Sequence, residues 1–147
     1  MNKLNPAIVV VAFNRPDALT RLLTSLSNAD YCDKNVMLHI SIDGGGDSFD
    51  SVVKVAKEFN WPFGEKLLMP QIENLGLKRH VLMCGDLSSK YSNIILLEDD
   101  LVVSVDFYNY AQAALNFYAN DTKIGGISLY SYEYSEITRE RFYAYTD

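Results

Sequence analysis

Short, unbroken apolar runs alternate along this chain with segments whose apolar residues recur at helical spacing. The clearest runs are residues 7–13 (AIVVVAF) and residues 94–97 (IILL), the second within a strand expected at residues 93–97. A short apolar run of this kind is typical of a strand that is buried on both faces of a parallel sheet. After the first run, Pro16 suits the first turn of a helix, and leucines then follow at helical spacing. The alternation predicts an α/β fold, with a mostly parallel, Rossmann-like sheet flanked by helices.

The same two patterns predict the remaining elements. Further strands are expected at residues 36–42, 66–69 and 124–129, the last being the fifth strand. Further helices are expected at residues 50–59, 77–91 and 105–118.

The composition is that of a globular domain and argues against some classes of partner. The chain has 147 residues, of which 48% are hydrophobic and 22% are charged. Its formal net charge of −6 argues against nonspecific binding to nucleic acid or anionic lipid, because both are polyanions. Residues 1–6 do not resemble the start of a signal peptide, and no apolar run has the length of a transmembrane segment. We therefore expect a cytoplasmic protein, with peripheral membrane contact left open, in which Cys32 and Cys84 are buried thiols.

Three consecutive carboxylates follow the strand expected at residues 93–97. Glu98, Asp99 and Asp100 fall at the expected end of that strand, where open α/β sheets bind their ligands. Adjacent negative charges repel one another, so a folded protein keeps them near water or pairs them with a cation. Mg²⁺ and Mn²⁺ take oxygen ligands and often share them with substrate phosphates. The triplet therefore indicates a metal–nucleotide site, and a solvated turn is the alternative.

Polar loops also follow the first two expected strands. The first loop consists of Ala12, Phe13, Asn14 and Arg15. The second begins with Asp43 and Gly44, and two more glycines follow, which allow a ligand to approach the backbone closely. A flexible turn is the alternative for the glycine run. The run is not a P-loop, since no Gly-Lys-Ser/Thr follows, nor is it a dinucleotide fingerprint, which follows a first strand. Together with the acidic triplet, these loops predict a nucleotide-binding crevice.

A basic turn precedes the helix expected at residues 77–91. The turn and the helix start contain Asn74, Gly76, Lys78 and Arg79. A helix N-terminus favours anions, so Lys78 or Arg79 could meet a diphosphate, and a solvated basic turn is the alternative. His39, inside a strand, is interpreted as structural, whereas His80 is left open between a ligand contact and a partly buried helix residue.

Taken in order, these motifs resemble the nucleotide-sugar-binding half of a GT-A type glycosyltransferase, broadly of family 2. The motifs are an apolar strand ending Ala-Phe-Asn-Arg-Pro, a strand ending in Asp43 with glycines, Asn74-x-Gly76, and hydrophobics before Glu98-Asp99-Asp100. The stretch LLEDDLVVSVDFYNY is also similar to eukaryotic N-acetylglucosaminyltransferases acting on mannose, whose variant of the Asp-x-Asp motif is Glu-Asp-Asp. The resemblance covers residues 7–130 and implies the GT-A nucleotide-sugar-binding fold.

The resemblance also implies a role for each loop. The loop from Ala12 to Arg15 would line the base pocket, and Asp43 would contact uracil or ribose. Asp100 would be the direct ligand of Mn²⁺ or Mg²⁺, with the ion bridging the diphosphate of the donor. Glu98 and Asp99 would hold ribose or sugar hydroxyls, or bind the metal through water. The expected nucleotide-sugar-binding set is Ala12, Phe13, Asn14, Arg15, Asp43, Gly44, Asn74, Gly76, Lys78, Arg79, Glu98 and Asp99.

The expected function is that of a metal-dependent glycosyltransferase domain. Its donor would be a UDP-sugar or a similar nucleotide sugar, and the acceptor would be a hydroxyl of a glycan or glycoconjugate. The resemblance implies hexosyl or N-acetylhexosaminyl transfer, inversion at the anomeric carbon and a place in polysaccharide assembly. Inversion needs a carboxylate base. No carboxylate after residue 129 lies in a recognisable context, so we expect the base beyond the chain end.

This interpretation divides the chain and leaves alternatives. Residues 1–130 would be the donor-binding domain, and the tyrosine-rich residues 131–147 would begin an acceptor-binding half. A noncatalytic nucleotide-sugar-binding domain is one alternative, which stays open because no catalytic base is recognised in the chain. A sugar-nucleotide pyrophosphorylase would need a loop rich in glycine and arginine after the first strand, which Asn14-Arg15-Pro16 does not provide. A receiver-like signalling domain would carry its paired acids after the first strand.

Overall fold

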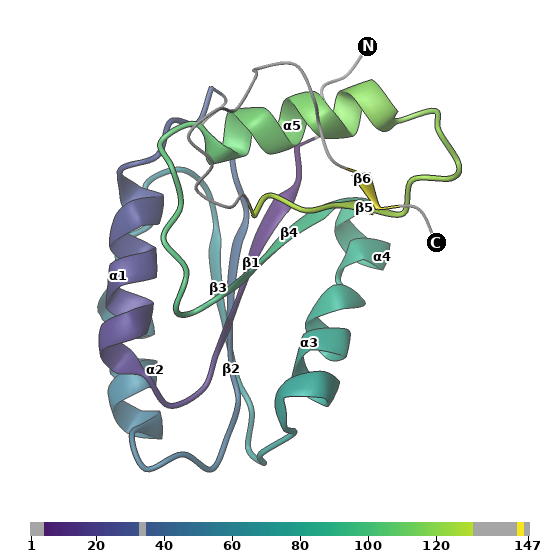
Figure 1. Ribbon diagram of the computed structural model, residues 1–147. Helices are drawn as coiled ribbons and strands as arrows, with labels where there is room; N and C mark the ends of the chain where they lie inside the picture. Colours follow the sequence, from purple (N-terminus) through teal and green to yellow (C-terminus); the bar gives the residue numbers. More distant parts are fainter. Residues whose placement is uncertain (1–4, 33–34, 131–143, 146–147) are drawn as a thin grey trace, which may run out of the picture.

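The structure is a computed structural model that describes residues 5–32, 35–130 and 144–145. Its centre is an all-parallel, four-stranded sheet with the order β3-β2-β1-β4 (Figure 1). The strands are β1 (Ala7–Ala12), β2 (Leu38–Ile42), β3 (Lys66–Pro70) and β4 (Ile94–Glu98). β1 and β2 are buried along their whole length, as the unbroken apolar sequence of β1 predicts, whereas β2 also buries the polar His39 and Ser41. The expected α/β, Rossmann-like class is confirmed.

The strand order creates a switch point between β1 and β4. The chain runs outward from β1 to β2 and β3, and then returns to the other side of β1 for β4. Val10 of β1 is paired with Ile40 of β2 and with Leu97 of β4. In open α/β sheets, ligands bind at such a point, in the crevice outside the carboxyl ends of the strands. In receiver domains β1 lies between β2 and β3. Here β1 lies between β2 and β4, so the strand order excludes the receiver-like alternative.

Helices cover both faces of the sheet (Figure 1). One face carries α1 (Pro16–Ser27), α2 (Phe49–Glu58) and α5 (Phe107–Tyr118), and the other carries α3 (Leu77–Gly85), which is followed by α4 (Ser88–Tyr91). Side chains of β1 alternate between these faces, so Ile8 and Val10 lie in the larger core. Val9 and Val11 instead pack against Cys84 of α3. Both cores therefore hold β1 firmly in the middle of the sheet.

The leucine stripe of α1 anchors the loop that follows β1. Leu19, Leu22 and Leu26 are fully buried, and they belong to the larger core. Pro16 opens the helix, so the chain passes from the end of β1 into α1 within a few residues. Burial of the stripe against the sheet therefore fixes Arg15, which precedes the helix, near the carboxyl edge of β1.

The fifth strand expected at residues 124–129 is wrong in both length and pairing. Only β5 (Gly126–Ile127) is extended there, and it pairs antiparallel with β6 (Ala144–Tyr145) in a separate sheet. Gly125 and Gly126 interrupt the apolar pattern, and glycine has no side chain to pack in a buried strand. The parallel sheet of the described residues therefore has four strands.

The single helix expected at residues 77–91 is also wrong, because two helices form there. α3 ends at Gly85, and Asp86 and Leu87 form a turn before α4. The backbone at Ser92, with a φ of 65°, ends α4. Leu87 still packs on the smaller core, so the apolar period continues through the turn and hides the break. The other expected elements differ from the structure only at their ends.

Both cysteines are free, but only Cys84 is buried, so the expectation of two buried thiols is wrong for Cys32.

No helix among the described residues combines the length and apolar character needed to cross a bilayer. Except for β6, the stretch at residues 131–147 that was expected to begin an acceptor-binding half lies outside the described residues.

Candidate functional site

Polar loops from neighbouring strands meet at the carboxyl edge of the sheet, where the switch point lies. Two of these loops are tied to the end of β1. Val11 O accepts a hydrogen bond from Asp99 N–H at 3.0 Å, and Ala12 O accepts one from Asp43 N–H at 2.8 Å. These bonds extend the pairing of β1 just beyond the ends of β4 and β2. The acidic residues that follow β4 and β2 therefore flank the loop after β1.

Arg15 joins the β1 loop to the acidic triplet. Its guanidinium donates one hydrogen bond to Asp99 Oδ1 and another to Asp100 Oδ2, the second at 3.0 Å. Phe13 N–H donates a longer bond, of 3.4 Å, to Asp99 Oδ2. Burial acts to lower the pKa of Arg15, but hydrogen bonds and charge attraction from the two carboxylates outweigh burial and raise that pKa. One cation thus bridges two carboxylates that would otherwise repel each other.

The three adjacent carboxylates have different surroundings. The Asp99 side chain is 3% exposed, whereas that of Asp100 is 47% exposed. Glu98, the last residue of β4, is also exposed. A buried charge requires a partner, so Asp99 depends on Arg15 and on the Phe13 N–H group. The triplet is therefore neither a wholly solvated turn nor a convergent set of three ligands.

Asp43 holds the turn that begins α3. It is 3% exposed, and its Oδ1 accepts hydrogen bonds from Gly44 N–H at 3.0 Å and Leu75 N–H at 2.7 Å. Its Oδ2 accepts a third from Gly76 N–H at 3.0 Å. Asn74 Oδ1 accepts a further bond from Gly76 N–H, and Gly76 has a positive φ of 75° at the start of the helix. The carboxylate therefore meets the positive end of the α3 dipole and positions this turn.

The glycines after β2 allow neighbouring loops to pack closely against this one. A Cβ atom on Gly44 would lie 2.8 Å from backbone atoms of Gln71 and Glu73, in the loop after β3. A Cβ atom on Gly46 would lie 2.5 Å from Asn14 Oδ1, in the loop after β1. The glycine run is thus explained by close contacts within the protein, which hold the loops after three neighbouring strands against one another.

Replacing Gly44 with alanine is expected to lower the free energy of unfolding by about 2 kcal/mol, since overpacking costs roughly 1–3 kcal/mol. The added Cβ would meet backbone carbonyls, which cannot move aside as a flexible side chain would. Gly85→Ala is the matched control, because no atom lies within 4 Å of its Cβ position and alanine favours helix. Urea unfolding compares the two variants. Equal stability would contradict the close packing at Gly44.

A small polar cluster is buried between β2 and the helices on its second face. His80 is 2% exposed, and its Nε2 shares a 2.7 Å hydrogen bond with Ser41 Oγ. His39 is equally buried and shares a 2.8 Å bond with the hydroxyl of Tyr91. Burial lowers the pKa of both imidazoles, and the Asp43 carboxylate opposes this shift for His80 without reversing it. His39 is structural, as its place in a strand indicates, and His80 is a buried helix residue.

The two histidines are expected to lower the free energy of unfolding in mild acid. Because each folded-state pKa lies below the unfolded value of about 6.5, the unfolded chain binds more protons as the pH falls. Their stabilisation is complete above about pH 6.5, and each histidine loses up to about 1.4 kcal/mol per pH unit below it. Urea unfolding at about pH 7.5 and about pH 5.5 measures this loss. His80→Asn should reduce the dependence of stability on pH. A urea midpoint of the parent that is the same at both pH values would contradict the prediction.

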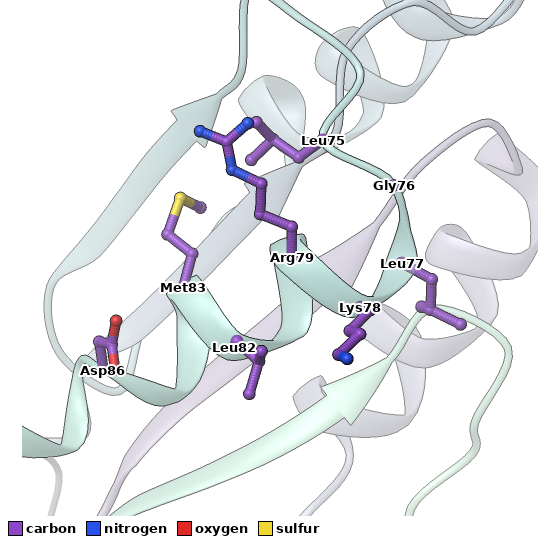
Figure 2. Close-up of a pocket in the computed structure, with 8 residues that line it drawn as sticks. All are labelled: Leu75, Gly76, Leu77, Lys78, Arg79, Leu82, Met83 and Asp86. Carbon is purple, nitrogen blue, oxygen red and sulfur yellow. The ribbon is translucent and has the colours of Figure 1, made fainter.

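An open groove of about 620 Å³ runs along the outer side of α3 (Figure 2). Its lining consists of Leu75, Gly76, Leu77, Lys78, Arg79, Leu82, Met83 and Asp86. Arg79 extends beside Leu75, whereas Lys78 points to the other side of the helix. The two exposed cations therefore diverge, and a diphosphate contact by Lys78 or Arg79 stays a prediction.

The predicted residues form two adjoining groups in the structure. Arg15, Asp99 and Asp100 are in direct contact, with Phe13 joined through its N–H group. The second group is the turn held by Asp43. The sequence reasoning missed the bridge from Arg15 to the triplet, because these residues are neighbours only when β4 lies beside β1. Only the strand order could have indicated it.

A divalent ion at this edge would need water or phosphate oxygens as ligands in addition to protein carboxylate. Among the residues that the structure describes, no group of three or more His, Cys, Asp or Glu side chains is placed to hold a metal. Asp100 nevertheless presents a half-exposed carboxylate at the switch point. Mg²⁺ commonly binds through one or two carboxylates together with substrate phosphates and water. The donor set therefore fits an ion that is shared with a diphosphate.

The sheet and its edge define an α/β domain of the Rossmann-like type, and solved structures share this fold. No protein-family model matches the chain, and no curated protein matches it. The structure of TarS from S. aureus is similar, with a TM-score of 0.59 and 14% identity over 78% of this chain. Complexes of a shorter TarS chain with UDP-GlcNAc and with UDP each give a TM-score of 0.55 and 16% identity over 88% of this chain.

TarS is a glycosyltransferase, and at these identities the likeness shows a shared fold. The chain spans 20% of the full TarS chain and 37% and 38% of the two shorter ones that carry UDP-GlcNAc and UDP. The present chain therefore corresponds in fold to one part of a larger protein.

Proposed function

We propose that this chain is the donor-binding part of a glycosyltransferase and that it binds a UDP-sugar at the switch point between β1 and β4. One observation carries the proposal. Arg15, Asp99 and Asp100 meet at the ligand-binding edge of a fold shared with TarS, and TarS has been solved with UDP-GlcNAc and with UDP. The fold and the edge chemistry together support nucleotide-sugar glycosyltransfer.

The loops after β1 and β2 would bind the nucleoside. In this proposal the loop from Ala12 to Arg15 lines the base pocket. Asp43 already accepts three backbone N–H groups. Carboxylate oxygens together have about four lone-pair sites, so Asp43 retains acceptor capacity for uracil or ribose. The turn at Asn74 and Gly76, held by Asp43, would border the same pocket.

The acidic triplet would bind the diphosphate side of the donor. Asp100 is proposed as the protein ligand of Mn²⁺ or Mg²⁺, in a variant Asp-x-Asp motif. When bound, the ion would neutralise negative charge as the nucleoside diphosphate leaves. Glu98 is exposed and would hold ribose or sugar hydroxyls, whereas the buried Asp99 would act from its pair with Arg15.

The proposal for the transfer step is based on the sequence resemblance to GT-A type glycosyltransferases. The chain would contribute donor binding to hexosyl or N-acetylhexosaminyl transfer, with inversion, onto a hydroxyl of a glycan or glycoconjugate. The class of pathway would be polysaccharide assembly. An inverting transfer requires a carboxylate base for the acceptor hydroxyl, and we place this base outside the described residues.

Calorimetric titration of UDP into the chain, with Mn²⁺ and again with EDTA, tests the proposal. We expect binding that requires the metal, and weaker binding of ADP as the matched nucleotide. Binding that EDTA leaves unchanged would reject the metal while keeping the nucleotide site. Absence of binding under both conditions would contradict the proposed function.

A further inference from the structure

We propose that Arg15 is an internal counter-cation, which occupies the acidic site in the absence of donor and is displaced from Asp100 when a divalent ion binds. This inference rests on the proposed function and concerns how the same site is regulated. The guanidinium comes from the loop after β1, and both of its carboxylate partners come from the loop after β4.

The two ion pairs of Arg15 differ in strength because their carboxylates differ in burial. The Asp99 side chain is 3% exposed, so removing its partner would leave a buried charge uncompensated. The Asp100 side chain is 47% exposed, and the Arg15 side chain is 54% exposed. Ion pairs between exposed groups contribute little to stability. The Arg15–Asp100 contact is therefore the weaker one, and it can break while the Asp99 contact remains.

A divalent ion and the Arg15 guanidinium would compete for the Asp100 carboxylate. Asp100 Oδ2 accepts the hydrogen bond from Arg15, so an ion that binds both carboxylate oxygens would take the atom that Arg15 uses. Two cations on one exposed carboxylate also repel each other. Ion binding at Asp100 and the Arg15–Asp100 bond are therefore mutually unfavourable. The released guanidinium arm would lie beside the ion, with free donors of the geometry that suits phosphate oxygens.

Mn²⁺ affinity without donor tests the displacement directly. We would compare the parent chain with Arg15→Gln, Arg15→Lys and Arg21→Gln, using electron paramagnetic resonance of free Mn²⁺. Arg15→Lys keeps the charge but cannot bridge two carboxylates as a guanidinium does. Both Arg15 variants are expected to bind Mn²⁺ about two- to fivefold more tightly, the range for an exposed ion pair. Arg21, exposed on α1, should show no change in affinity when replaced.

Nuclear magnetic resonance of the parent chain provides a test without substitution. Titration with diamagnetic Mg²⁺ should shift the Nε–H signal of Arg15, assigned from its loss in Arg15→Lys. The signal of Arg21 should stay in place. The midpoint of the Arg15 shift should coincide with that of Mg²⁺ binding measured by calorimetry. A stationary Arg15 signal at saturating Mg²⁺ would overturn the displacement.

The variants also separate displacement from simpler explanations. Tighter binding in Arg15→Gln alone would assign the effect to net charge and overturn the inference. Weaker Mn²⁺ binding in both Arg15 variants would also overturn it, and would make Arg15 a positioning residue for the triplet. Equal metal binding in all four proteins would reject the displacement but not the proposed function. Absence of Mn²⁺ binding in every protein would overturn the displacement, whereas the titration of UDP in Mn²⁺ would still decide whether donor binding depends on metal.

Discussion

Asp100→Asn is expected to abolish metal-dependent UDP binding while leaving the fold intact. Asparagine keeps the size of the side chain but removes the negative charge that a divalent ion requires. Loss of a residue that only orients a metal ligand already costs about 10- to 100-fold in affinity, so loss of the ligand itself should cost about 100-fold or more. The side chain is half exposed, and surface substitutions usually change stability by less than about 0.5 kcal/mol.

Calorimetry with Mn²⁺ and with EDTA measures this effect, and Asp106→Asn is the matched control. Asp106 precedes α5, is exposed, and makes no side-chain capping hydrogen bond. The Asp106→Asn variant makes the same change of charge in the loop that follows the triplet, and it should bind UDP as the parent does. Unchanged UDP affinity of Asp100→Asn in Mn²⁺ would reject Asp100 as the metal ligand.

Asp43→Asn is expected to lower the free energy of unfolding by about 2–4 kcal/mol, since hydrogen bonds to charged groups contribute about 1.5–3 kcal/mol each. The carboxylate uses both oxygens to accept three backbone N–H groups. Asparagine has one acceptor oxygen, and its amide group would place a donor against a donor in a buried site. The change would also remove the negative charge at the N-terminus of α3.

Urea unfolding measures the stability of Asp43→Asn, and Asp47→Asn, exposed in the same loop, is the control. Uridine binding in EDTA is a separate measurement on the folded variants. The predicted nucleoside contact requires weaker uridine binding by Asp43→Asn. Equal uridine affinity in variant and parent would refute that contact, and stability equal to that of Asp47→Asn would refute the positioning of the turn.

Local patterns predicted most of the parallel sheet because burial on both faces leaves a visible mark in the sequence. β1 needs apolar side chains on both faces and therefore appears as an unbroken run. β4 also has a clear end in the sequence, because its last residue, Glu98, is charged and exposed. The positions of the candidate loops follow from these strand ends.

The wrong predictions arise where a local pattern was short or where packing continued through a break. At β5 two glycines stand in what would be a strand, and the segment pairs with distant residues instead of joining the parallel sheet. Between α3 and α4 the apolar period persists, because Leu87 packs against the same core from a turn. Side-chain periodicity reports which face is buried, and it does not report whether the backbone stays helical.

By itself, the sequence determined the α/β class, the strand ends and the kinds of side chain available there. Only the tertiary structure decided which of those side chains meet. Arg15 contacts Asp99 across 84 residues of sequence, and Asp43 holds Gly76 across 33. Both contacts depend on which strands lie beside β1 and β2. Strand order is a property of the whole packed sheet. An apolar run shows that a strand is buried on both faces, but it does not show which strands lie beside it.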